Sequence, residues 1–199
     1  SKPPFQPRQV FLFSGHMIDA PDRANPRFPA GKESIAAQRI AAALDALGAG
    51  PGDLALAQGA SGGDLLSLEA CKARGLRLRL MLPFAEPEFI ERSVLPVVDG
   101  AHWCERYYSL RADLADPPRI MPVELGPLPR VGRDETMNPY ERCNLWLLNT
   151  ALAWGIDRVR FICLWNGAGG DGPGGTAHMY QEVRRRTGRV TWLDTRTLW

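Results

Sequence analysis

The sequence has few residues of the kinds that build metal sites or disulfide frameworks. It contains four cysteines and three histidines in 199 residues. No two of the cysteines are close enough for a zinc knuckle or a C-x-x-C redox pair; they are Cys71, Cys104, Cys143 and Cys163. Three of them lie in apolar segments, where cysteine packs as a small core residue. We therefore expect no bound metal, no cofactor and reduced thiols, as in the cytoplasm.

Long apolar runs and a strong charge of one sign are also missing. No apolar run approaches the roughly 18 residues that cross a bilayer. The segment 1–7 is rich in proline and has no apolar stretch typical of a signal peptide. The net charge of +2 gives no electrostatic case for binding nucleic acid or a membrane. We expect a cytoplasmic protein whose partner is a small molecule.

Apolar segments alternate with segments of helical periodicity along the chain. Strands are predicted at 9–13, 54–57, 76–82, 159–165 and 190–193. Helices are predicted at 31–47, 62–74, 86–95, 140–154 and 175–186. This alternation predicts a single α/β domain over residues 1–199, with a Rossmann-like, mostly parallel sheet and helices on both faces.

Two parts of the chain leave alternatives open. Residues 101–115 are compatible with a helix, or with a strand followed by a turn. Residues 116–136 contain five prolines and are predicted to form a long surface connection, which is often functional in a compact domain. Because the chain starts at Ser1 rather than Met, the sequence is also compatible with a domain excised from a longer protein.

Two glycine-rich turns each follow a predicted strand and precede a predicted helix. The first consists of Gly59, Ala60, Ser61, Gly62, Gly63 and Asp64. The second spans 166–176 and ends in Gly174, Gly175 and Thr176. Such turns aim backbone N–H groups and a helix N-terminus at an anion, which predicts a ligand with phosphate groups. The alternative is a pair of tight turns that merely need glycine, with Asp64 as a helix cap.

The carboxyl ends of parallel strands form the usual ligand site of such a sheet. The loop after the first strand also reaches this edge, and it adds the candidate ligand contacts Ser14, Gly15, His16 and Arg27. His178, which follows the second turn, is a further candidate. Arg27 and Arg92 are candidate clamps for phosphate or carboxylate. The alternative for each arginine is a solvated surface residue. The first turn, 59–64, is neither a Walker A motif nor a G-x-G-x-x-G motif, and Ser14 and His16 alone do not indicate a nucleophile dyad.

These segments resemble the SLOG superfamily, which includes LOG-type phosphoribohydrolases, the DNA-processing protein A fold and nucleotide-sensing domains of TRPM channels and bacterial defence proteins. The resemblance is carried by residues 11–16, 58–70 and 172–182, and loosely by 89–93. It implies a nucleotide-derived ligand, such as an ADP-ribose-like molecule. Domains of this family are often joined to effector domains, so we expect a fused or associated effector domain, or a homo-oligomer, as the macromolecular partner.

Residues 172–182 depart from the enzymes' motif P-G-G-x-G-T-x-x-E. Glu182 lies one residue further from Pro173 than the motif requires, and Gln181 stands in its place. One residue rotates a helical side chain by about 100°. We therefore expect a sensor module rather than an enzyme. The alternatives are a nucleotide N-glycosidase, in which the resemblance makes Glu182 and Arg92 catalytic, and an interaction scaffold with a vestigial pocket.

Overall fold

The structure is a computed structural model that describes residues 3–169 and 174–199. In this part of the chain, one sheet has the strand order β4-β3-β2-β1-β5-β6, and all neighbouring strands are parallel. The strands are β1 (Val10–Gly15), β2 (Leu54–Ala57), β3 (Arg77–Leu82), β4 (Arg119–Ile120), β5 (Val159–Trp165) and β6 (Thr191–Asp194). The predicted α/β class and parallel sheet are confirmed.

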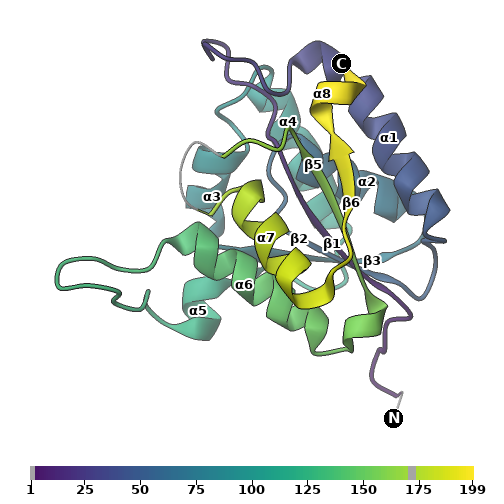
Figure 1. Cartoon of the computed structure of the whole chain (residues 1–199), viewed down its shortest axis with the longest axis vertical. Helices are drawn as coiled ribbons and strands as arrows, with labels where there is room; N and C mark the ends of the chain where they lie inside the picture. Colours follow the sequence, from purple (N-terminus) through teal and green to yellow (C-terminus); the bar gives the residue numbers. More distant parts are fainter. Residues whose placement is uncertain (1–2, 170–173) are drawn as a thin grey trace.

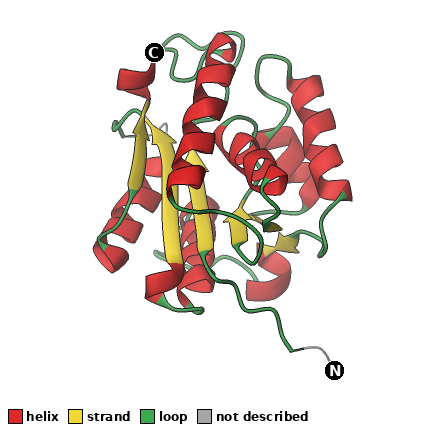
Figure 2. Cartoon of the chain, turned by 90° about the vertical axis from the view of Figure 1, so that its right-hand side faces the viewer, coloured by secondary structure: helices red, strands yellow, loops and turns green. Residues whose placement is uncertain are grey.

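Helices cover both faces of the sheet (Figures 1 and 2). One face packs against α1 (Glu33–Ala46), α2 (Gly63–Ala73), α3 (Glu86–Ser93) and α4 (Gly100–Ala112). The other face packs against α5 (Met121–Leu125), α6 (Pro139–Leu152) and α7 (Thr176–Thr187). Short elements complete the chain: η1 (Ala30–Lys32), η2 (Ile156–Arg158) and α8 (Thr195–Leu198). Within the described residues, no helix is long and apolar enough to cross a membrane.

The central strand β1 shows why its sequence is apolar throughout. Phe11 and Phe13 point into the core beneath α1 and α2, whereas Val10 and Leu12 point into the core beneath α6 and α7. All four are buried. A strand covered on both faces needs a continuous apolar run rather than an alternating one.

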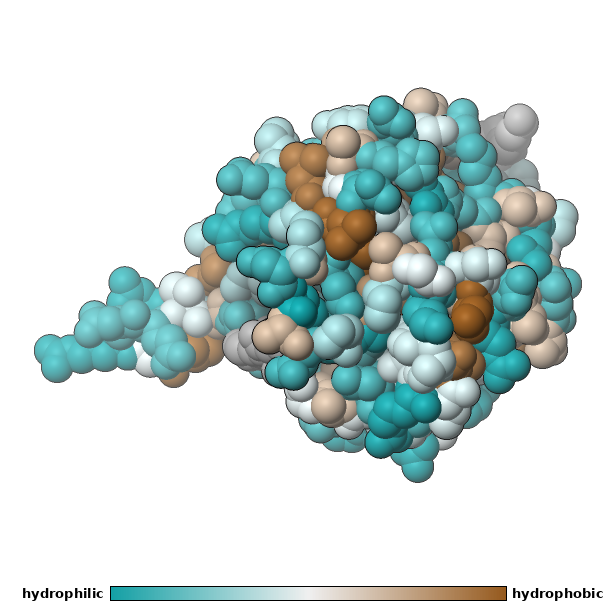
Figure 3. All heavy atoms as spheres, turned by 90° about the horizontal axis from the view of Figure 1, so that it is seen from above, coloured by the Kyte–Doolittle hydropathy of each residue, from teal (hydrophilic) through white to brown (hydrophobic). Residues whose placement is uncertain are grey.

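The middle of the chain resolves the alternatives that the sequence left open. Residues 101–112 are helical, within α4, and 113–115 follow the end of this helix. The prediction of a connection without regular structure at 116–136 is wrong in its first half, which forms β4 and α5. Ile120 extends the sheet edge and Met121 is buried against the core, so this segment packs as part of the domain. Residues 126–138 then form an arm that projects from the body with hydrophilic side chains at its tip (Figures 1 and 3).

The first glycine turn lies directly against the loop that follows β1. Gly63 N donates to the carbonyl of His16 at 3.0 Å, and Ile18 N donates to the carbonyl of Ser61 at 3.1 Å. Gly62, between them, has φ of +114°, and a Cβ atom at this position would lie 2.7 Å from Ile18 N. Glycine is therefore required here by both backbone conformation and space.

We expect Gly62→Ala to destabilise the fold by at least about 2 kcal/mol, because it combines a strained positive φ with a clash against backbone. Gly31→Ala is the matched control, since an added Cβ there meets no atom within 4 Å. Urea unfolding of both variants measures the effect. A Gly62→Ala midpoint equal to that of Gly31→Ala would contradict this account of the turn.

Candidate functional site

The strand order creates a crevice at the carboxyl ends of β1 and β5. From β1 the chain builds β2, β3 and β4 on one side, and it later places β5 and β6 on the other. The loops after β1 and β5 therefore diverge, which is where open α/β sheets bind ligands. A cavity of about 140 Å³ lies here, which we call the crevice cavity. It is lined by Phe13, Ser14, Gly15, Met17, Gln58, Ala60, Asp64, Ser93, Tyr140, Asn144, Leu147, Gly174, Gly175 and Thr176.

The crevice cavity brings together residues from both glycine turns. Ala60 and Asp64 come from the first turn, and Gly174, Gly175 and Thr176 come from the second. A hydrogen bond from Ser14 Oγ to Thr176 Oγ1, 3.1 Å long, joins the end of β1 to the start of α7. Residues 170–173 of the second turn lie outside the described residues.

Helix α6 forms a wall of the cavity that the sequence did not predict. Tyr140, Asn144 and Leu147 are spaced by four and three residues, so they share one face of α6. Asn144 is buried, and its Nδ2 donates to the carbonyl of Gly174 at 2.9 Å. The signal available in the sequence was a polar Asn within an otherwise apolar helical stripe. Gln58, at the end of β2, was also missed as a cavity residue.

Gly174 packs against the beginning of α6. Its φ is +86°, and a Cβ atom would lie 2.5 Å from Tyr140 Cβ and 2.6 Å from Glu141 N. Asn138 caps this helix by accepting from Tyr140 N at 2.9 Å. The second turn therefore needs glycine at 174 in order to approach α6, whereas a Cβ at Gly175 would meet no atom within 4 Å.

Much of the first turn forms hydrogen bonds with protein carbonyl groups rather than facing the cavity. Ser61 N donates to the carbonyl of Ser93 at 2.9 Å, and Ser61 Oγ donates to the carbonyl of Val94 at 2.7 Å. Gly63 N donates to His16, as described above. Gly59 borders Leu80 and Tyr107 and does not line the cavity. These donors have protein acceptors, so the first turn meets the cavity mainly through Ala60 and Asp64.

Asp64 places a buried carboxyl group in the cavity wall. The backbone N–H groups of Gly59 and Ala60 donate to it, the latter at 3.3 Å. Burial outweighs these bonds and raises the pKa of Asp64 to about 7. None of the described residues that line the cavity is Lys, Arg or His. A buried carboxyl with a shifted pKa in a cleft is a feature typical of functional sites.

Neither predicted histidine lines the cavity. His16 is buried, its Nε2 accepts from Asn166 N at 3.1 Å, and burial lowers its pKa to about 4. It therefore stays neutral and holds the start of the second turn against β1. His178 Nδ1 lies 3.2 Å from Asn144 Nδ2. Arg27 donates its backbone N–H to Asp19 and does not contribute to the lining.

The two residues considered for catalysis also lie outside the lining. Glu182 forms an ion pair with Arg185 on α7. Arg92 pairs with Glu88 at 3.1 Å, and its guanidinium lies 5.2 Å from the ring centroid of Phe84. Their described contacts are thus with neighbouring protein side chains.

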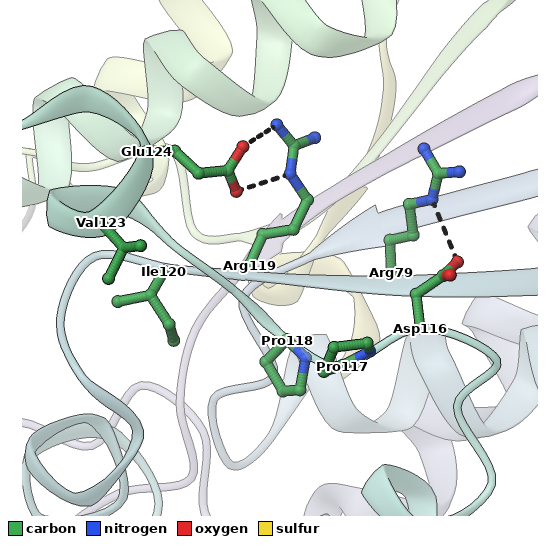
Figure 4. A pocket seen from close by; sticks show the side chains of 8 residues that line it. All are labelled: Arg79, Asp116, Pro117, Pro118, Arg119, Ile120, Val123 and Glu124. Atoms are coloured by element: carbon green, nitrogen blue, oxygen red, sulfur yellow. Dashed lines mark hydrogen bonds and ion pairs between the residues drawn. The ribbon is translucent and has the colours of Figure 1, made fainter.

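A larger cavity, about 500 Å³, lies at the sheet edge beside β4 (Figure 4). Its charged groups are paired: Arg119 Nη2 lies 2.6 Å from Glu124, and Arg79 Nε lies 3.8 Å from Asp116. None of the described residues of either glycine turn lines it. Across the described ranges, no group of three His, Cys, Asp or Glu side chains is placed to hold a metal.

Comparisons with known proteins return a distant likeness. No protein-family model and no curated protein matches this chain. Among solved structures, the chain is similar to the Moco carrier protein from Chlamydomonas reinhardtii, at 13% sequence identity and a TM-score of 0.35. The match covers 95% of this chain and 91% of that protein.

We expect Asp64→Asn to change how stability depends on pH. In the folded state the pKa of Asp64 is about 7, above the ordinary aspartate value of 3.8. The folded state therefore binds more protons than the unfolded state between these values, and Asp64 lowers stability as pH rises from about 4 to 7, by at most about 1.4 kcal/mol per pH unit. The side-chain amide of the variant does not titrate, so the variant should gain stability relative to wild type over this interval.

Urea unfolding at pH 4, 5.5 and 8 measures this difference. Asp45→Asn is the control, because Asp45 is exposed and paired with Arg74. An Asp64→Asn effect that is constant across these pH values would show that the folded-state pKa is not raised.

Proposed function

We propose that this protein binds a phosphorylated, nucleotide-derived ligand, such as an ADP-ribose-like molecule, as a sensor module of SLOG type. One observation carries the proposal. The crevice cavity lies at the switch point between β1 and β5, and both glycine turns contribute to its lining. Separate structural turns would not need to converge on one cavity.

The dimensions indicate that only part of such a ligand enters the cavity. Its volume of about 140 Å³ is below the roughly 300–1,000 Å³ of pockets that enclose a drug-sized molecule. The rest of the ligand would lie across the rim. There, the first N–H groups of α7, from Thr176 onward, have no acceptor within their own helix and suit a phosphate.

Binding is better supported than N-glycosidase activity. Hydrolysis of a nucleotide needs a carboxylate within hydrogen-bond reach of the ribose or of the attacking water. Glu182 is paired with Arg185 and does not line the crevice cavity. The same proposal includes three further parts. The module is attached to an effector domain or assembles into a homo-oligomer, and it acts in bacterial defence signalling.

We expect Gly175→Val to weaken binding of ADP-ribose and AMP by at least about tenfold, because it adds bulk at the cavity lining, where an added Cβ meets no protein atom within 4 Å. Gly31→Val is the matched control, since an added Cβ there also meets open space. Calorimetric titration measures affinity, and thermal unfolding without ligand checks that both variants are folded.

Three results would contradict the proposal. Unchanged affinity in a folded Gly175→Val would remove the crevice cavity as the site. Absence of any thermal shift with ADP-ribose, AMP or related nucleotides would favour the scaffold alternative. Release of free base from AMP by the wild-type protein would instead favour the N-glycosidase alternative.

A further inference from the structure

The inside of the crevice cavity is chemically unlike its rim at α7. Its lining holds the Asp64 carboxyl, two side-chain amides and four hydroxyl groups, and none of its described residues is Lys, Arg or His. The amides are Gln58 and Asn144, and the hydroxyls belong to Ser14, Ser93, Tyr140 and Thr176. This set is rich in acceptors and has no cation.

We propose that the cavity interior is a sugar subsite, in which the ribose hydroxyl groups of the ligand donate hydrogen bonds to the Asp64 carboxylate. The proposal rests on the proposed function and deepens it, because it separates the sugar from the phosphate. The sugar lies beside Asp64, and the phosphate lies at the other side of the cavity, against the first turn of α7.

The hydrogen bonds of the first turn argue against a phosphate in the interior. Ser61 N and Gly63 N donate to protein carbonyl groups, and Ala60 N donates to Asp64 itself. A phosphate placed here would meet a buried carboxylate without a lining cation to offset the repulsion. The group that fits must therefore supply its own hydrogen-bond donors and carry no negative charge.

A sugar ring meets both requirements. A carboxylate offers about four acceptor positions, so Asp64 can accept from the backbone and from a ligand hydroxyl together. Amide and hydroxyl side chains donate as well as accept, which matches neighbouring hydroxyl groups on a ring. The volume of about 140 Å³ is below the roughly 300–1,000 Å³ of pockets that enclose a drug-sized molecule, which suits a sugar ring rather than a whole nucleotide.

The environment of Asp64 makes such binding sensitive to pH. Burial raises the pKa of Asp64, and the N–H groups of Ala60 and Gly59 lower it. The other titratable group coupled to it in the described structure is the Cys143 thiol on α6, whose pKa is itself raised. A hydroxyl donor stabilises the ionised carboxylate, so ligand binding should lower the pKa of Asp64 and release a proton near pH 7.

The first test compares AMP with 2′,3′-dideoxy-AMP at pH 8 by calorimetric titration. Wild-type protein should bind AMP about 10- to 100-fold more tightly, the range for a hydrogen bond to a charged group. In Asp64→Asn this preference should fall to about threefold or less. Asp45→Asn, a surface substitution, should keep the wild-type preference.

The second test follows ADP-ribose binding between pH 6 and pH 8, where the pyrophosphate does not titrate. Wild-type affinity should increase with pH, by up to about tenfold per unit below the pKa of Asp64. Calorimetry in buffers of different ionisation enthalpy should show proton release. Asp64→Asn should show neither effect.

The outcomes separate this inference from the proposed function. Equal wild-type affinity for AMP and dideoxy-AMP overturns the sugar subsite and leaves nucleotide binding intact. A folded Asp64→Asn that binds both ligands more tightly and keeps their ratio also overturns it, because the carboxylate would then only repel phosphate. Asp64-dependent binding of D-ribose 5-phosphate without AMP binding supports the subsite and overturns the nucleotide proposal. No binding of ADP-ribose, AMP or D-ribose 5-phosphate overturns both.

Discussion

The close approach of the first glycine turn to the loop after β1 is the constraint on which the candidate site depends. Gly62 has a positive φ and leaves no room for a Cβ between Ile18 N and the carbonyl of His16. The hydrogen bonds on either side of it join the beginning of α2 to the end of β1. Asp64 on α2 and Ser14 on β1 therefore line one cavity.

The same constraint alters the chemistry of the turn. A glycine turn before a helix ordinarily offers its N–H groups to an anion. Here the donors at Ser61 and Gly63 bind protein carbonyl groups, and Gly59 and Ala60 donate to Asp64. The two turns thus differ: the first presents a buried carboxyl, and the second leads into the first turn of α7, whose N–H groups have no acceptor within that helix.

Much of the fold was predictable because burial on both faces imposes a readable pattern. The strands at 54–57 and 159–165 were predicted with the bounds that the structure has, since each is a mainly apolar run between polar breakers, with Arg160 as the charged exception. The strand and helix within residues 116–125 were not predicted, because a two-residue edge strand and a five-residue helix carry too little periodicity to be recognised. Their structure depends on contacts with β3 and the core.

The candidate site was likewise predictable from the sequence only in part. By itself, the sequence determined which loops end at the carboxyl edge of the sheet and where glycine permits close backbone approach, because both follow from local pattern and residue type. Only the tertiary structure decided the neighbours of those loops. It brought Asn144 of α6 to the second turn and left Glu182 paired with Arg185. It also buried Asp64 in a cavity whose described lining residues include no Lys, Arg or His, since desolvation and charge pairing depend on residues far apart in sequence.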